Sequence, residues 1–384
     1  MHFLSWATVG AFTPFIVIFL MARNISTVSI GIILMLNSVA TLVGQPIWGM
    51  LSDKFRSIKK VYLFCITVST VLILLLPLIK NEAGIFIFMP LISFFFCCVG
   101  PLLDSWTIHS TKNSGKSYGA YRLWGSIGYS VISIIIGKLI NFAFVNIIFV
   151  VYAILSIITL VAITLFYQYK DEEDGIMKRV LSIKDLQVGR LAKNYYYMTF
   201  VVLACIMYIT WNSFYNFLPA LIKQVGGDDG LYGIAQAVSA FSEVPILLFS
   251  SRLAKKFKPQ VLILFGMLVF VLRLFLYSIA WSPDIIIFVQ AFNGLSFAMF
   301  LSGSIYYIDS LTPPELKATA QTVAPAVYGG LSGIIGNAMS GKLIEMYGIP
   351  FVCRTGGMIA AAVFILFLGT LLLGKYLKIP RHTS

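Results

Sequence analysis

Apolar runs separated by short polar breaks dominate the chain from end to end. A helix of about 20 apolar residues is long enough to span the hydrocarbon core of a bilayer. The pattern predicts twelve such helices, which we place at 3–21, 28–50, 61–79, 85–108, 119–142, 144–168, 195–222, 229–250, 259–281, 284–308, 319–345 and 350–374. The first run lacks the small-residue cleavage site of a signal peptide, so we expect it to remain as a helix.

The composition excludes a soluble protein. Of the 384 residues, 59% are hydrophobic and 11% are charged, and the mean hydropathy is +0.91. Soluble domains contain about 25% charged residues. We therefore predict an all-α membrane protein.

Lysine and arginine fall mainly on one side of the predicted membrane. The termini and the loops after even-numbered helices hold twenty of the 28, whereas the opposite loops hold five. The basic side is expected to be cytoplasmic, which places both termini there. The net charge of +13 therefore reports topology, and we expect no nucleic-acid partner.

A charged segment divides the chain into two halves. We interpret 169–194 as a cytoplasmic linker between the sixth and seventh predicted helices. The sequence GKLI occurs at 137–140 and again at 341–344, and Pro-Ile occurs at 46–47 and again at 245–246. Offsets of about 200 residues at matching places in the topology are typical of transporters built from parallel repeats. We predict two pseudo-symmetric six-helix bundles, 1–168 and 195–384.

Glycines are concentrated in the segments 119–142 and 319–345. They include Gly125, Gly128 and Gly137 in the first, and Gly329, Gly330, Gly333, Gly336 and Gly341 in the second. Small residues allow helices to approach closely in lipid, so we expect tight packing along these faces. A sharper interpretation is that the smooth faces let the two halves rock against each other.

The five cysteines all lie in apolar runs without paired spacing. Neither a disulfide framework nor a zinc site is predicted, and we expect no cofactor. A membrane enzyme is the least favoured class, because no nucleophile elbow, phosphate loop or metal-ligand spacing stands out.

Charged residues within apolar segments cost about 2.5–3.5 kcal/mol each and are by default functional. Asp104 and Arg122 each lie nine residues from Asn113 at a predicted hairpin tip. Two helical arms would therefore place them at one depth, where they can form an ion pair. Glu243 and Arg273 are likewise symmetric about Lys258. A purely structural ion pair is the alternative for each.

Several stretches carry a resemblance to a known family. The loop GMLSDK at 49–54, followed by Lys59 and Lys60, resembles the loop between the second and third helices of the major facilitator superfamily. Within that superfamily the chain is similar to lactose permease-like and phenylpropionate permease-like proton symporters. The similar segments are GAFTPF at 10–15, QPIWG at 45–49, YGAYRLWGSIGY at 118–129 and PPELKATAQ at 313–321.

The resemblance implies a major facilitator fold and roles for individual residues. Asp104 and Arg122 would hold the solute, Tyr129 would stack on a sugar ring, and Asn293 would belong to the same site. Glu243 and Arg273 would link solute to proton. Gly49, Asp53 and Lys54 would form a conformational loop.

The chain also departs from those symporters. Asn293 and Ser296 stand where they carry a histidine and an acidic residue. Two possibilities remain open: Glu243 carries the proton alone, or transport is uncoupled.

We predict a secondary active transporter that imports a small organic solute, such as a sugar, with protons. The alternatives are an efflux antiporter for drugs or metabolites and an importer of a nucleoside or aromatic acid. The expected setting is the plasma or inner membrane of a bacterium, with the lipid bilayer, the solute and protons as partners. We expect a monomer.

Overall fold

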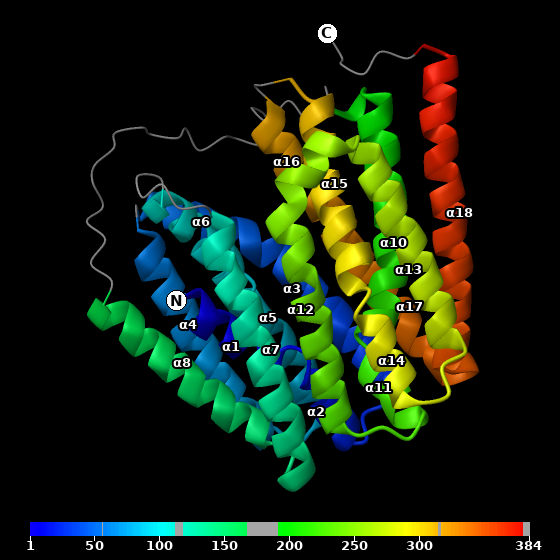
Figure 1. Cartoon of the computed structure of the whole chain (residues 1–384). Coiled ribbons are helices and arrows are strands. Elements are labelled where there is room, and N and C mark those ends of the chain that lie inside the picture. The colour runs from blue at the N-terminus through cyan, green and yellow to red at the C-terminus, as the bar shows by residue number, and fades with distance from the viewer. Residues whose placement is uncertain (56, 112–117, 167–190, 314–315, 379–384) are drawn as a thin grey trace.

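The computed structural model describes residues 1–55, 57–111, 118–166, 191–313 and 316–378. Its regular elements are helices arranged as two bundles side by side (Figure 1). The N-terminal half contains α1 (His2–Phe12), α2 (Ile16–Ala22), α3 (Thr27–Lys54), α4 (Ile58–Leu75), η1 (Leu76–Leu78), α5 (Glu82–Phe96), α6 (Val99–Thr111), α7 (Tyr118–Phe142) and α8 (Ile147–Phe166).

The C-terminal half follows the same plan. It contains α10 (Tyr195–Tyr215), α11 (Leu218–Gln224), α12 (Asp229–Lys256), α13 (Pro259–Ser278), α14 (Pro283–Gln290), η3 (Gly294–Ala298), α15 (Met299–Leu311), α16 (Lys317–Pro325), η5 (Ala326–Leu331), α17 (Ser332–Tyr347) and α18 (Ile349–Tyr376). Most of the predicted linker 169–194 lies outside the described residues.

The predicted apolar segments correspond to the helices of the structure. In the described parts of the chain, 11 helices or helix pairs are long and apolar enough to cross a membrane. The remaining predicted segment, 319–345, contains α16, η5 and α17. Several crossings are interrupted: the first breaks between α1 and α2, and the seventh between α10 and α11. The tenth and eleventh contain the π-helices η3 and η5, a geometry often found at functional sites.

The two halves touch through two glycine crossings. Gly31 of α3 faces Gly341 of α17, and Gly137 of α7 faces Gly233 of α12. These crossings lie at the predicted extracellular end, and each joins one helix of either half. They are related by the internal repeat, because Gly137 and Gly341 begin the two GKLI sequences.

Only glycine fits at these crossings. A Cβ atom at Gly341 would lie 2.4 Å from the Thr27 carbonyl oxygen, and one at Gly233 would lie 2.3 Å from the Ser133 carbonyl oxygen. Contacts under 3.0 Å to backbone cannot be relieved by turning a side chain, so the helices would have to move apart. The expectation of close packing is confirmed at Gly137 and Gly341, whereas a Cβ at Gly329 would meet nothing within 4 Å.

Polar contacts reinforce this closed end. Asn141 of α7 donates to Asp228, the N-cap of α12, at 2.7 Å. On the other crossing, Thr27 donates to Glu345 at 3.3 Å. Both contacts join the two halves, so the predicted extracellular end is shut by backbone packing and hydrogen bonds together.

The halves spread apart toward the predicted cytoplasmic end, where α18 ends (Figure 1). Along α7, Ile136 is fully buried beside the crossing, whereas Trp124 is 56% exposed nearer the other end. The structure therefore has one closed and one divergent end.

We expect alanine at Gly233 and Gly341 together to open the closed end, because each new Cβ meets backbone. Spin labels on cysteines at positions 138 and 342, both exposed lysines in opposite halves, should move further apart in pulsed EPR measurements. The five native cysteines are replaced in this background.

The matched control is Gly369→Ala, since a Cβ there meets nothing within 4 Å. An unchanged label distance in the double variant would show that the glycine crossings do not determine closure.

Candidate functional site

A buried arginine organises the middle of the C-terminal half. Arg273 of α13 is 3% exposed. Its Nη1 donates to the Asn293 side-chain oxygen at 2.7 Å and to the Ser296 hydroxyl at 2.5 Å. A guanidinium cannot lose its charge in a protein, so burial requires acceptors around it.

The other side of the guanidinium meets two more acceptors. Arg273 Nη2 donates to Gln290 Oε1 at 2.7 Å and to the Tyr277 hydroxyl at 3.1 Å. Tyr277 in turn donates to Gln290 Oε1 at 3.0 Å. All four acceptors are neutral groups, and Arg273 belongs to neither ion pair of the described residues. Asn293, Ser296, Gln290 and Tyr277 are called the arginine cage below.

The interrupted tenth crossing supplies three of the four cage residues. Helix α14 ends at Gln290, and the π-helix η3 begins at Gly294. Gly294 lies against α12: its N–H donates to the Ser242 hydroxyl at 2.9 Å, and a Cβ there would lie 1.9 Å from the Ser242 carbonyl oxygen. Because residue 294 is glycine, the tenth crossing packs directly against α12 on one side. On the other side, Ser296 accepts from Arg273 of α13.

Asn293 connects the cage to a carboxylate. Its Nδ2 donates to Glu243 Oε1 at 2.8 Å. Asn293 is 2% exposed, whereas Glu243 of α12 is half-buried. Glu243 and Arg273, predicted to share a depth, are therefore joined through one amide rather than by direct contact.

The N-terminal half contributes a second arginine. The Arg122 guanidinium of α7 lies 3.9 Å from the ring centre of Trp6 in α1, a cation–π contact. Gly125 makes room for this arrangement, because a Cβ there would lie 2.6 Å from the Trp6 ring and 3.0 Å from Arg122 Nη1.

The two halves bring their charges near each other. Arg122 and Arg273 both lie within electrostatic range of Glu243. Tyr129 of α7 and Tyr215 of α10 do as well. A carboxylate from one half thus lies within electrostatic range of an arginine and a tyrosine from the other.

A chain of hydrogen bonds leads from this centre to the closed end. The Tyr215 hydroxyl donates to Gln236 at 2.8 Å, Gln236 donates to the Tyr232 hydroxyl at 2.7 Å, and Tyr232 donates to the Pro14 carbonyl at 2.9 Å. Pro14 lies in the break between α1 and α2. The chain therefore ties a broken helix of one half to α12 of the other.

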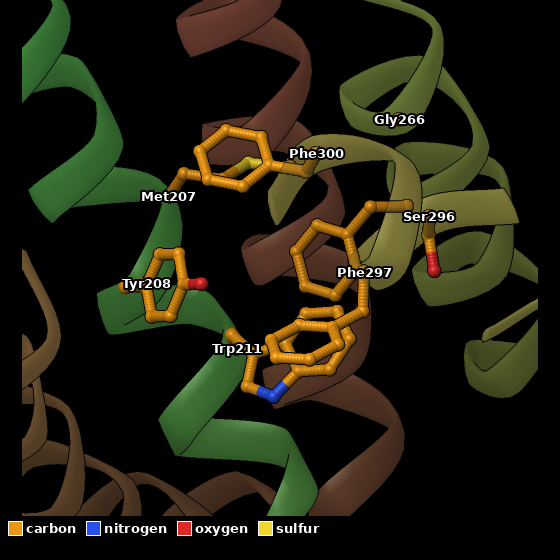
Figure 2. Close-up of a pocket in the computed structure, with 8 residues that line it drawn as sticks. Met207, Tyr208, Trp211, Gly266, Ser296, Phe297 and Phe300 are labelled. Atoms are coloured by element: carbon orange, nitrogen blue, oxygen red, sulfur yellow. The ribbon is translucent and has the colours of Figure 1, made fainter. Parts of the chain in front are cut away.

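Aromatic rings pack beside Ser296, one residue of the arginine cage (Figure 2). Trp211 stacks on Phe270 at 4.8 Å and contacts Phe297 at 5.1 Å between ring centres. The cavity that they line with Ser296 has a volume of about 10 Å³, room for about one water molecule. In Figure 2 the Ser296 hydroxyl turns away from the rings, in keeping with its bond to Arg273. This cavity is too small for a sugar ring.

The predicted Asp104–Arg122 ion pair is not formed. Asp104 is half-buried on α6, which packs against α7 as expected. The ion pairs among the described residues are Lys223–Asp229 and Lys317–Asp309. Arg122 has the Trp6 ring as its neighbour instead, which offsets the cost of its partial burial without a carboxylate in contact.

The loop residues lie apart from this centre. Asp53 and Lys54 are exposed at the end of α3, and a Cβ at Gly49 would meet nothing within 4 Å. Their conformational role stays a prediction.

Sequence reasoning missed Trp6, Gln290, Tyr277 and Gln236 as parts of the centre. Each is an ordinary residue within an apolar segment, and no motif marks it. The spacing of Gln290, Asn293 and Ser296, three residues apart, was an available signal, because it places polar groups on one helical face.

Comparisons with known proteins cover nearly the whole chain. The model of the "MFS_1 like family" matches residues 1–354. Maltose permease of Geobacillus stearothermophilus is 24% identical over 352 residues, 91% of this chain and 88% of that protein. Lactose permease of Citrobacter freundii is 21% identical over 388 residues, 94% of this chain and 90% of that protein.

Among solved structures, the nucleoside transporter NupG matches with a TM-score of 0.83 and 17% identity, covering 96% of this chain and 97% of that one. This match confirms the predicted arrangement of two six-helix bundles.

The arginine cage predicts a stability effect. Gln290→Leu removes the oxygen that accepts from both Arg273 and Tyr277, so we expect a loss of about 1–3 kcal/mol of stability. The measurement is thermal unfolding in detergent, followed by a thiol-reactive dye that reports exposure of the buried cysteines. Gln224→Leu, at an exposed helix end, is the control. Equal melting temperatures for the two variants would contradict the role of the cage.

Proposed function

We propose that this chain, which belongs to the MFS_1-like family and is a secondary transporter of small solutes, imports a hydroxylated solute such as a sugar together with a proton. Its relatives are transporters and not enzymes. The observation that supports the proposal is that Glu243, which accepts from Asn293 in one half, lies within electrostatic range of Arg122 and Tyr129 in the other.

The chemistry of this centre suits a neutral solute with several hydroxyl groups. A guanidinium presents its N–H donors in a planar fork, so Arg122 can donate to the oxygens of two vicinal hydroxyls. The Tyr129 ring can pack on the apolar side of a sugar ring. Both residues lie on one half, within electrostatic range of Glu243 on the other, so a solute bound to them would lie near the coupling carboxylate as the halves move.

Nucleoside import is the second candidate. NupG, the structural match, is a nucleoside transporter, and an aromatic ring of this centre could stack on a base. Sugars and nucleosides share a hydroxylated ring, so Arg122 would act on either.

Glu243 is the proposed proton carrier. Among the described acidic residues, it is the one within a C-terminal helix that contacts the buried polar centre. It lies within electrostatic range of two arginines, one from each half. When the halves move, its distance to Arg122 must change, and with it the balance between the protonated and ionised carboxyl group. That change is what coupling requires.

The solute assignment predicts the effect of changing Arg122. In proteoliposomes, counterflow of labelled maltose, lactose and uridine should identify the accepted class. Arg122→Gln should abolish counterflow of that solute, and Arg122→Lys should lower it about tenfold or more because the planar fork and its ring contact are lost.

The control is Arg354→Gln, on the exposed surface of α18, which should transport normally. Counterflow that survives Arg122→Gln would remove Arg122 from the solute site.

The coupling assignment predicts a split between two activities. Glu243→Gln should lose accumulation driven by a pH gradient yet keep counterflow exchange, because exchange does not require the empty carrier to release its proton. Both activities are measured in the same vesicles, with Glu82→Gln at the exposed start of α5 as control. Accumulation that persists in Glu243→Gln would refute the assignment, and loss of both activities would place Glu243 in the solute site.

A further inference from the structure

The hydrogen bonds that join Asn293 to Glu243 and Arg273 can run in only one direction. A guanidinium has only donors, and an ionised carboxylate has only acceptors. The amide of Asn293 presents its oxygen to Arg273 at 2.7 Å and its nitrogen to Glu243 at 2.8 Å. A side chain between them must carry one acceptor and one donor, and an amide does so.

The amide also keeps the two charges apart. Arg273 donates its other hydrogen bonds to Ser296, Tyr277 and Gln290, all neutral. In a low-dielectric interior, an arginine and a carboxylate within reach attract strongly. Asn293 occupies the position that a direct ion pair would need, and the close approach at Gly294 holds that segment against α12.

We propose that Asn293 is a positioning residue: it spaces Glu243 from Arg273 so that the carboxyl group stays free to gain and lose its proton. The inference rests on the proposed role of Glu243 as proton carrier. It assigns Asn293 to coupling, where the sequence alone assigned it to solute binding.

The titratable and charged groups within electrostatic range of Glu243 can also affect whether its carboxyl group is protonated. They are Arg122 and Tyr129 on α7, Tyr208 and Tyr215 on α10, and Arg273 on α13. The tyrosines are neutral, so the arginines are the charges that decide its state. Asn293 acts on one of them, Arg273.

The test uses the full chain without solute. Infrared difference spectra between acid and neutral pH report the C=O stretch of protonated carboxyl groups, and the band absent from Glu243→Gln is that of Glu243. In Asn293→Ala the guanidinium and the carboxylate can close into an ion pair. The Glu243 band should then appear at a pH lower by about 1–3 units than in the parent protein, since an adjacent opposite charge favours the ionised form.

Asn293→Asp provides an independent test with an isosteric side chain. Its carboxylate still accepts from Arg273 but presents an oxygen to Glu243, so the two acids must share a proton. The protonated band should persist to a pH about 1 unit higher or more than in the parent. Asn212→Ala is the control, because this amide of α10 donates to Tyr208 and Ser332 and not to the cage.

The outcomes separate this inference from the proposed function. No band lost in Glu243→Gln would overturn the proton-carrier assignment and the inference with it. A Glu243 band that is present, but unmoved or moved to higher pH in Asn293→Ala, would overturn the role of Asn293 alone. If Asn293→Ala fails to fold, a parent-like titration of Asn293→Asp overturns it.

Discussion

The buried guanidinium of Arg273 is the constraint on which the C-terminal half depends. A permanent charge at 3% exposure must be surrounded by acceptors, because its desolvation costs several kcal/mol that only good hydrogen bonds offset. Gln290, Asn293 and Ser296 all come from the tenth crossing, where α14 ends and the π-helix η3 begins. The irregular part of this crossing therefore lies where its side chains surround the charge.

The same break sets the position of the carboxylate. Gly294 permits backbone contact with Ser242, and this contact brings Asn293 within 2.8 Å of Glu243. Burial of one charge and placement of another are therefore parts of a single arrangement. In the N-terminal half, Gly125 performs a comparable task by making room for Trp6 beneath Arg122. Glycine at these points controls where functional side chains lie.

Closure depends on glycine in a different way. At the two glycine crossings, the backbones of helices from opposite halves lie so close that no side chain fits between them. Such contacts are either fully made or lost, which favours two discrete arrangements over a continuous range. The chain from Tyr215 through Gln236 and Tyr232 to Pro14 runs from the charged centre to this seam. It gives the centre a direct physical connection to the end that must open.

The sequence by itself determined the membrane class, the apolar segments and the two-bundle plan, because helix length and hydrophobicity in a bilayer are local properties. The equal spacing of Glu243 and Arg273 about Lys258 also placed both in one polar centre, since two helical arms of equal length reach one depth. Only the tertiary structure decided which groups touch. It inserted Asn293 between that pair, gave Arg122 the Trp6 ring instead of Asp104, and interrupted the tenth crossing. Those choices depend on helix rotation and on close approaches at single glycines, which arise from packing between segments far apart in the chain and leave no periodic signal within any one of them.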